Sequence, residues 1–279
     1  MTGRLASSAE EVDKVLASHR DNALAHLQAR RFAEARAEFV RALRLTDWAE
    51  EAVPDFRLSL AVVTGLIYPY GSLLIRQEEF ATAAHYLDQA RRYLQYFETK
   101  NLLKSRARLR QYCTLTRRGV ELESAYLALR QRDYARATAQ ATQLVKSLSH
   151  GSGTRSFQRL RASTHLVLAK ADYEQRRYRA ADVHVMRALT VYPQHEDAET
   201  LRALIQARLL FAEGRLNDAL AAAISGCQQA LNRSGITCPQ EISALAQVET
   251  FLHAVQQAQR DPRLWARVMP DEREEIGEF

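Results

Sequence analysis

One pattern recurs five times along the chain and limits what it can fold into. Each copy begins with an aromatic residue or Leu after a short polar turn, and small or apolar residues follow three, seven and ten positions later. These offsets fall on one face of an α-helix, so each copy predicts a helix with a narrow stripe against which a neighbouring helix can pack closely. The five copies are Phe32-Ala35-Phe39-Ala42, Phe80-Ala83-Leu87-Ala90, Tyr134-Ala137-Ala141-Leu144, Tyr178-Ala181-Val185-Ala188 and Leu216-Ala219-Ala223-Gly226.

The composition agrees with a chain made of helices. Only 10 Gly and 6 Pro occur in 279 residues, Ala is abundant, and runs of Val, Ile and Thr are almost absent. Because Gly and Pro interrupt helices while β-branched runs favour strands, this composition argues against a sheet-based fold. Hydrophobic residues make up 47% of the chain, which is enough to bury a core and excludes wholesale disorder.

The repeated stripe resembles the second helix of the tetratricopeptide repeat, a family of stacked helical hairpins. An apolar helical segment of roughly 15–20 residues precedes each copy, as a helix-turn-helix unit requires. Gly71 stands where the family's first helix has its packing glycine, and Pro193 stands where its second helix commonly ends. The copies start 48, 54, 44 and 38 residues apart, so helices or loops should be longer than in the family's regular repeat. The resemblance implies an all-α, right-handed superhelix (an α-solenoid) of about five antiparallel helix-turn-helix repeats.

Local signals place several helices along the chain. Ser8 followed by Glu11 predicts a capped helix start. The segment Leu58–Ile75 carries no charged residue, and we expect a buried helix rather than a membrane span, because polar residues dilute it and Pro69 should break it. Asn101–Arg130 predicts one long helix, whose inner stripe includes Leu102, Leu109, Cys113, Thr116 and Val120.

Glycines and prolines also predict the domain organisation. His150–Gly153 is the expected hinge, so residues 1–150 would hold the first three repeats. Residues 151–258 would hold the last two repeats and a C-terminal capping helix that starts at Cys238-Pro239. Residues 259–279 would form a short helix and an acidic tail, whose last nine residues carry a net charge of −4.

The motifs of common enzymes are missing from the sequence. Phosphate-binding glycine loops, zinc-protease motifs and nucleophile elbows do not occur, and the eight His residues are scattered. The three Cys residues form no CxxC pair, and the N-terminal residues include acids and lack an apolar core. We therefore expect a non-enzymatic protein without a metal or cofactor, in a reducing compartment such as the cytoplasm.

The resemblance also implies a binding face. In a stack of hairpins the first helices line a concave surface, where peptides commonly lie. Arg and aromatic residues on that face favour an amphipathic partner with acidic side chains. The alternative is that the aromatic residues pack between helices while the cations are merely solvated. The predicted groove residues are Arg20, Tyr68, Ser72, Arg76, Tyr126, Arg130, Lys170, Tyr173, Arg208 and Phe211.

A carboxylate clamp for chaperone tails, known in this family, is disfavoured. That clamp needs asparagines just after the packing residue of the first two repeats, where this sequence has Leu24 and Ser72.

A second candidate surface is a run of basic residues with interleaved tyrosines. Between Arg91 and Arg118 there are nine basic residues and one acid, which gives a net charge of +8 over 28 residues. Cations neutralise phosphates and tyrosines can stack on unpaired bases, so an RNA-associated protein is the alternative function. The residues of this basic cluster are Arg91, Arg92, Lys100, Lys104, Arg106, Arg108, Arg110, Arg117 and Arg118.

The main interpretation is thus a cytoplasmic scaffold or adaptor that binds another protein through a basic groove. A further alternative is a peptide-responsive regulator whose two halves shift about the predicted hinge. The acidic tail, Asp271–Phe279, could compete with a partner by docking on a basic surface.

Overall fold

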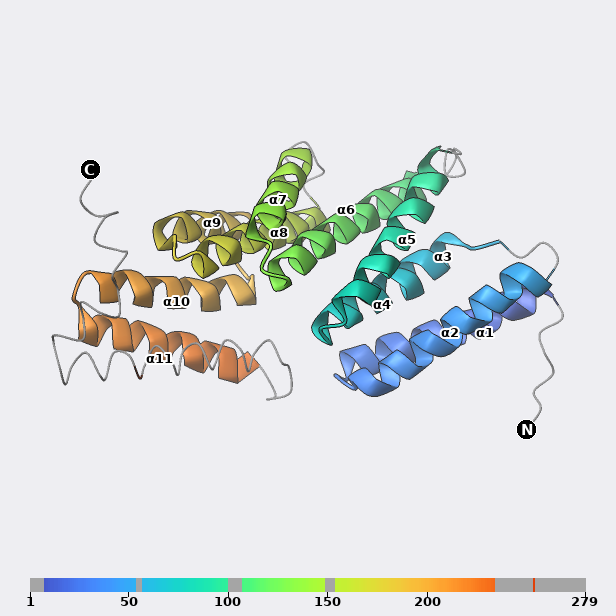
Figure 1. Cartoon of the computed structure of the whole chain (residues 1–279), viewed down its shortest axis with the longest axis horizontal. Coiled ribbons are helices and arrows are strands. Elements are labelled where there is room, and N and C mark those ends of the chain that lie inside the picture. Colours follow the sequence, from blue (N-terminus) through green and yellow to red (C-terminus); the bar gives the residue numbers. More distant parts are fainter. Residues whose placement is uncertain (1–7, 54–56, 100–106, 149–153, 234–252, 254–279) are drawn as a thin grey trace. The chain divides into compact units, whose positions relative to one another are not determined.

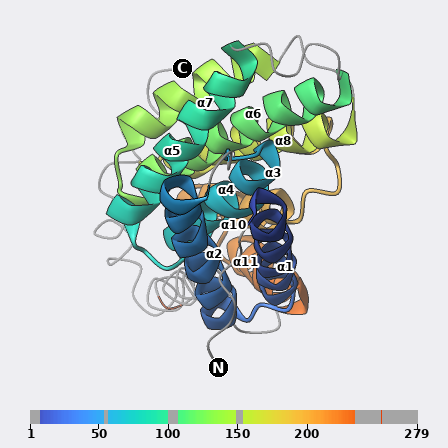
Figure 2. The same ribbon diagram turned by 90° about the vertical axis from the view of Figure 1, so that its right-hand side faces the viewer.

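The computed structural model describes residues 8–53, 57–99, 107–148, 154–233 and 253. Within these residues every regular element is a helix and no strand occurs, which confirms the predicted all-α class. The helices pack in neighbouring pairs such as α1/α2, α4/α5, α8/α9 and α10/α11, and α1 and α2 lie side by side in both views (Figure 1, Figure 2). The helices are α1 (Ala9–Gln28), α2 (Phe32–Ala52), α3 (Leu60–Val62), a π-helical turn (Val63–Ile67), α4 (Tyr68–Arg76), α5 (Phe80–Thr99), α6 (Ala107–Arg130), α7 (Tyr134–Leu148), α8 (Arg155–Glu174), α9 (Tyr178–Val191), α10 (Glu196–Ala212) and α11 (Leu216–Arg233).

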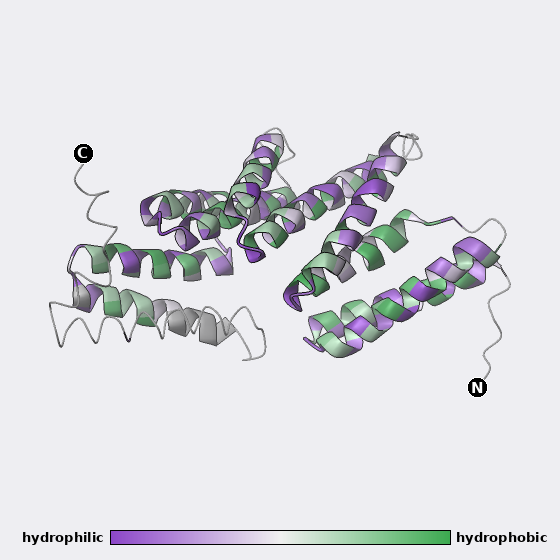
Figure 3. Ribbon diagram, in the orientation of Figure 1, coloured by the Kyte–Doolittle hydropathy of each residue, from purple (hydrophilic) through white to green (hydrophobic). Residues whose placement is uncertain are grey.

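The repeated stripe is buried in all five of the helices that it predicted. Positions three, seven and ten of each copy are buried, and most of them are completely inaccessible to solvent. Figure 3 shows hydrophobic and hydrophilic residues alternating along these helices, as amphipathic helices require. Gly71 faces the stripe residue Leu87, since a Cβ placed on Gly71 would lie 3.1 Å from Leu87 Cδ2. Small residues therefore set the close approach of paired helices.

Five turns share one backbone conformation. Three residues join each first helix to the helix that carries the stripe, and the middle residue always has a positive φ. In the first turn the Arg30 N–H donates to Leu27 O, and the Arg31 N–H donates to His26 O at 2.8 Å. The other four turns repeat both bonds, so each first helix ends in the same Schellman-type cap. The residues with positive φ are Arg30 (57°), Glu78 (63°), Arg132 (61°), Arg176 (62°) and Gly214 (78°).

The uncharged segment stays helical through Pro69, so the predicted break is wrong. The chain forms a π-helical turn at Val63–Ile67, and α4 follows from Tyr68 to Arg76 with Pro69 in its first turn. Pro lacks an N–H, and a π turn re-spaces the hydrogen bonds around it without ending the helix. Most of the segment is buried in the core, and none of the described helices combines the length and hydrophobicity needed to cross a membrane.

Two smaller predictions are also confirmed. Ser8 Oγ accepts a bond of 3.3 Å from the Glu11 N–H and caps α1. In α6 the predicted inner residues Cys113, Thr116 and Val120 are buried and Leu109 is half-buried, whereas Leu102 lies outside the described residues.

The chain divides into two compact units, Met1–Asp133 and Tyr134–Phe279, called here the N-terminal unit and the C-terminal unit. The N-terminal unit holds α1 to α6 around one hydrophobic core that includes Phe39. The C-terminal unit holds α7 to α11, and its core includes Tyr178. The predicted hinge, the predicted capping helix and the acidic tail lie outside the described residues, so the proposed boundaries at residues 150 and 258 stay predictions.

Candidate functional site

In the N-terminal unit, side chains of α4 meet side chains of α6. The two helices are in contact, and Ser72 Oγ donates to Glu123 Oε1 at 3.1 Å. One turn away, Tyr68 packs against Gly119, where a Cβ would lie only 2.9 Å from the Tyr68 hydroxyl. Arg76, one turn beyond Ser72, is exposed. We call Tyr68, Ser72, Arg76, Gly119 and Glu123 the α4–α6 polar cluster.

Two side chains of this cluster, Glu123 and Tyr68, have pKa values raised above their ordinary values. Burial raises the pKa of Glu123, and the Ser72 hydrogen bond and the Arg76 charge only partly oppose this. Burial also raises the pKa of Tyr68 well above its ordinary value, and the Glu123 charge acts in the same direction. Both side chains are nevertheless only half-buried. The cluster thus holds a carboxyl group that protonates more readily than usual, beside a tyrosine hydroxyl and a cation.

Three further predicted groove residues lie in the same unit. The stem of Arg20 covers Gly65 of the π turn, and its Nε donates to Asp21 Oδ1 at 2.9 Å. Tyr126 is half-buried and packs against the hydrophobic core. Arg130 Nη2 forms an ion pair of 2.6 Å with Glu78 Oε1, in the turn after α4.

In the C-terminal unit one predicted groove residue is wrong. Phe211 is completely buried, because α10 turns this side chain into the core, and it cannot touch a partner. Tyr173 packs edge-on against Tyr178 with ring centroids 5.4 Å apart, so it also contributes to packing. Lys170 and Arg208 are half-buried on α8 and α10.

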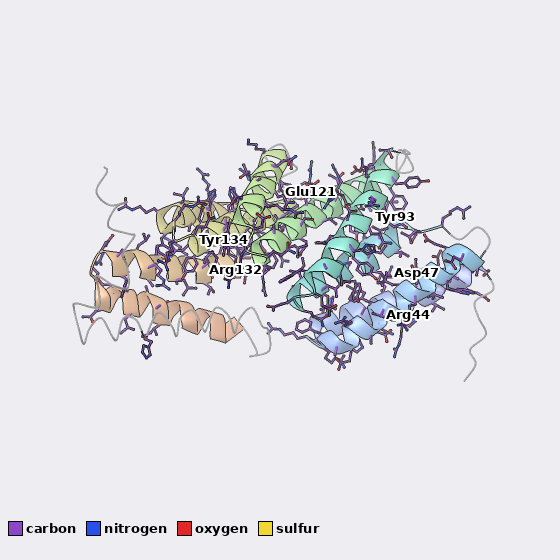
Figure 4. All side chains as sticks on the ribbon, in the orientation of Figure 1. Arg44, Asp47, Tyr93, Glu121, Arg132 and Tyr134 are labelled. Carbon is purple, nitrogen blue, oxygen red and sulfur yellow. The ribbon has the colours of Figure 1, made fainter. Side chains whose placement is uncertain are left out.

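The described part of the basic cluster is largely paired with acids. Arg91 and Arg92 both contact Asp88, at 3.5 and 2.6 Å. Arg118 contacts Glu121 at 2.8 Å, and Figure 4 labels this glutamate on α6. Asp88 and Glu121 lie just outside the window over which the sequence charge was counted, so that count overstated the local positive charge.

The remaining members of the basic cluster divide into two groups. Arg117 lies 3.3 Å from Glu98 Oε2, whereas Arg108 and Arg110 are exposed. Lys100, Lys104 and Arg106 lie outside the described residues.

The C-terminal unit also contains two packed histidines, one buried and one half-buried, that the sequence did not single out. The rings of His165 on α8 and His184 on α9 stack with centroids 5.8 Å apart. Asp172 Oδ2 lies 3.8 Å from His184 Nε2, while Asp172 Oδ1 accepts a bond of 2.6 Å from Arg177. Burial lowers the pKa of His165 to about 4, and the charges of neighbouring cations act in the same direction. Burial also lowers the pKa of His184.

A third histidine joins α8 to α10. His195 is the residue before α10, and its Nε2 lies 3.0 Å from Ser163 Oγ of α8. Burial lowers the pKa of His195, the charge of Asp197 raises it, and the charges of Lys170 and Arg159 lower it further. Charges on α8 and on α10 therefore act on His195 in opposite directions.

Glu123, His165, His184 and His195 were all missed by the sequence analysis. A helical register would have found Glu123, because it lies three residues before Tyr126 and seven before Arg130 on the same face. The histidine contacts join residues 19 and 32 positions apart, and no local spacing predicts them.

Metal binding finds no support within the described residues, where no three His, Cys, Asp or Glu side chains gather as ligands. When compared with known protein families and with curated proteins, the chain matches none of either.

Proposed function

We propose that this chain is a non-catalytic adaptor built from tetratricopeptide-like repeats. Its helix pairs would be antiparallel and would stack into a right-handed superhelix, with the first helix of each repeat on a concave face. The five shared turns and the five buried stripes support this architecture, because one supersecondary unit repeated along the chain has to bury its stripe against its neighbours. A segment of a partner protein would bind on the concave face.

The observation that carries the proposal is the α4–α6 polar cluster. Tyr68 and Glu123 are both half-buried, Ser72 donates a hydrogen bond to Glu123, and burial raises the pKa of Tyr68 and of Glu123. A helix pair with only a structural role has little reason to place a carboxyl group, a hydroxyl and a phenol together. Polar groups that converge between two helices are the kind of arrangement that binding sites use to orient a ligand.

The charges indicate what kind of segment would bind. Arg20, Arg76 and Arg130 supply positive charge to the N-terminal unit, but Asp21 and Glu78 already pair with two of them. A segment with acidic residues would gain most from the exposed Arg76, while aromatic surface such as Tyr126 would accept apolar side chains. The proposed ligand is therefore an amphipathic, acidic segment.

Affinity purification with the full chain tests this proposal, followed by direct binding of the captured segment as a synthetic peptide. We expect Arg76→Glu to weaken peptide binding at least tenfold, because it places a like charge beside acidic side chains. Arg44→Glu on α2 is the matched control, since Arg44 is an exposed arginine of the same unit and lies outside the cluster (Figure 4). Equal affinities for both variants and the wild type would refute the proposed face.

RNA binding is the second candidate, and one observation favours it. Tyr96 and Tyr112 are 51% and 47% exposed, which is unusual for tyrosines, and α6 also carries the exposed Arg108 and Arg110. Exposed aromatic rings beside cations can stack on unpaired bases. Purification with and without nuclease, followed by the ratio of absorbance at 260 and 280 nm, tests this. Nucleic acid that is lost on charge reversal at Arg108 and Arg110, but retained in Arg76→Glu, would favour it over the adaptor.

The other parts of the interpretation remain proposals. Cys113 is a free, buried thiol whose pKa burial raises to about 11, and such an unreactive thiol suits a reducing compartment such as the cytoplasm. A regulatory shift between two halves depends on the predicted hinge at residues 150–153, which lies outside the described residues.

A further inference from the structure

We propose that ionised Glu123 opposes the binding of an acidic partner segment beside Arg76, so that the segment binds together with a proton and more tightly at lower pH. This regulation rests on the proposed function, because it takes the α4–α6 polar cluster as the face that binds an amphipathic, acidic segment. The chain's own carboxyl group would then decide at which pH the segment is held well.

Two contacts show that α4 and α6 lie side by side in one register. Ser72 Oγ donates to Glu123 Oε1 across 51 positions of the sequence. Gly119 faces the Tyr68 hydroxyl, and these two residues are separated by the same 51 positions. Because the offset is constant, the two helices point in the same direction, and successive turns of α4 lie opposite successive turns of α6.

Arg76 lies between two acidic residues in this register. It is one helical turn beyond Ser72, and the next contact joins Arg130 Nη2 to Glu78 Oε1 at 2.6 Å, across 52 positions. Arg76 therefore follows the turn that holds Glu123 and precedes this ion pair. Glu78 is already compensated by Arg130, whereas neither Arg76 nor Glu123 forms an ion pair within the described residues.

Glu123 has little compensation of its own. The Ser72 hydroxyl is its one hydrogen-bond donor in the described part of the chain, and burial raises the pKa of Glu123. A partner carboxylate that reaches Arg76 would come close to Glu123, and carboxylates that share one site raise each other's pKa. Glu123 would then take up a proton. As a neutral acid it no longer repels the incoming group and can donate a hydrogen bond to it.

The other charged groups on the elements that pack around Glu123 keep their charge near neutral pH. Arg91 of α5 comes nearest along α6, since its Nη2 donates to Ser124 Oγ at 3.3 Å. Burial raises the pKa of Tyr68, which therefore stays neutral. Among the residues of the α4–α6 polar cluster, Glu123 is thus the one whose charge changes in this range. The neighbouring arginines each lie beside an acid, in the pairs Arg91 with Asp88, Arg118 with Glu121, Arg130 with Glu78 and Arg20 with Asp21.

Binding of a synthetic acidic peptide to the full chain at pH 7.5 and at pH 5.5 tests the proposal. The probe is a short acetylated and amidated peptide of Glu with a few Leu residues, whose acids remain largely ionised at both pH values. We expect the wild type to bind it at least threefold more tightly at pH 5.5. Calorimetry in two buffers of different ionisation enthalpy should also find proton uptake on binding at pH 6.5.

Variants decide whether Glu123 is the group that takes up the proton. Glu123→Gln keeps an acceptor for the Ser72 hydroxyl and removes the charge, so at pH 7.5 it should bind the peptide at least threefold more tightly than the wild type. Its affinity should also lose the dependence on pH. Glu121→Gln is the matched control, since it removes an equal charge from α6 at a residue that contacts Arg118 at 2.8 Å (Figure 4). This control should keep the pH dependence of the wild type.

The outcomes separate this proposal from the proposed function. Weaker binding by Glu123→Gln would overturn it, because Glu123 would then hold a basic group of the ligand, and so would a wild-type affinity that is independent of pH. The adaptor function stands after either result if Arg76→Glu still weakens binding and Arg44→Glu does not. If the wild type and Glu123→Gln both failed to bind the peptide at either pH, the proposed face would fall as well.

Discussion

The two units of this chain use the same paired helices, yet they bury ionisable groups of opposite character. Between its first helices the N-terminal unit holds Glu123, whose pKa burial raises. The C-terminal unit holds His165, His184 and His195, whose pKa values burial lowers. Both groups are less charged in the folded protein than they would be in water at the same pH, but one loses a negative charge and the other a positive charge.

This difference shows that the repeated stripe dictates how helices pair, and leaves the chemistry between neighbouring pairs free to vary. The stripe residues lie on the second helices and are buried alike in both units. The ionisable groups lie largely on the first helices and are held by contacts outside the stripe. The units can therefore differ in ligand without a change of scaffold.

The largest expected effect comes from matched truncations in the two cores. Phe39 and Phe211 are both completely buried, one in each unit. Phe39→Ala and Phe211→Ala should each lower the free energy of unfolding by about 3–5 kcal/mol, because each leaves a cavity. Calorimetry of the full chain should show each loss in a different transition. A stable Phe211→Ala variant with a binding defect alone would instead return Phe211 to the binding face.

Lowering the pH should destabilise the C-terminal unit, whereas protonation of Glu123 should stabilise the N-terminal unit. His165 has a pKa of about 4 when folded and near 6.5 when unfolded, so the C-terminal unit should lose stability as pH falls below 6.5, by about 2 kcal/mol at pH 5. Glu123 has a raised pKa when folded, so its contribution grows more favourable as pH falls through that pKa. Thermal unfolding at pH 7 and pH 5 measures both changes.

Two variants assign these pH effects to single residues. His165→Phe should remove most of the acid sensitivity of the C-terminal unit, and Glu123→Gln should remove the acid gain of the N-terminal unit. If His165→Phe unfolded with the same pH dependence as the wild type, the contrast between the units would lose its basis.

Substitutions at the positive-φ positions of two shared turns should change stability by smaller amounts and in opposite directions. Arg132, labelled in Figure 4, has a positive φ that an L-residue adopts unfavourably, so Arg132→Gly should stabilise the N-terminal unit by about 0.5–1 kcal/mol. Gly214→Ala should destabilise the C-terminal unit by about 1 kcal/mol through its backbone alone, since a Cβ there meets no atom within 4 Å. Chemical denaturation measures both, and two changes of the same sign would contradict the shared conformation.

The smallest expected effect concerns the acidic tail. Deletion of residues 270–279 should raise the affinity for an acidic partner about twofold to fivefold, because a competing negative charge is removed. Titrations of the full and shortened chains measure this change. Unchanged affinity would show that the tail does not compete for that surface.

Much of the helix arrangement could be predicted because it depends on local periodicity. Offsets of three, seven and ten place residues on one helical face wherever the chain is helical, so the stripes could be read without knowing any contact. The same reasoning placed Ser8 at a helix start and Cys113 on an inner face. It failed at Pro69, since the π turn that accommodates the proline depends on the packing of the whole segment.

The candidate sites were less predictable because they depend on which helices meet. The binding face expected from the resemblance included Tyr68, Ser72 and Arg76, but only the contact with α6 placed Glu123 beside Ser72. The same expectation put Phe211 on the binding face, whereas packing turned it into the core. The basic cluster shows the same limit, because its neutralising partners Asp88 and Glu121 lie in neighbouring turns outside the counted window.

By itself, the sequence determined that the chain is helical, where its repeated stripes lie and which residues are small enough to let helices approach. Only the tertiary structure decided that a carboxyl group is desolvated between α4 and α6, and that three histidines are desolvated in the C-terminal unit. The physical reason is that helix formation follows from neighbours a few residues apart. The charge state of a buried group follows instead from desolvation and from charges on helices that are distant in the sequence.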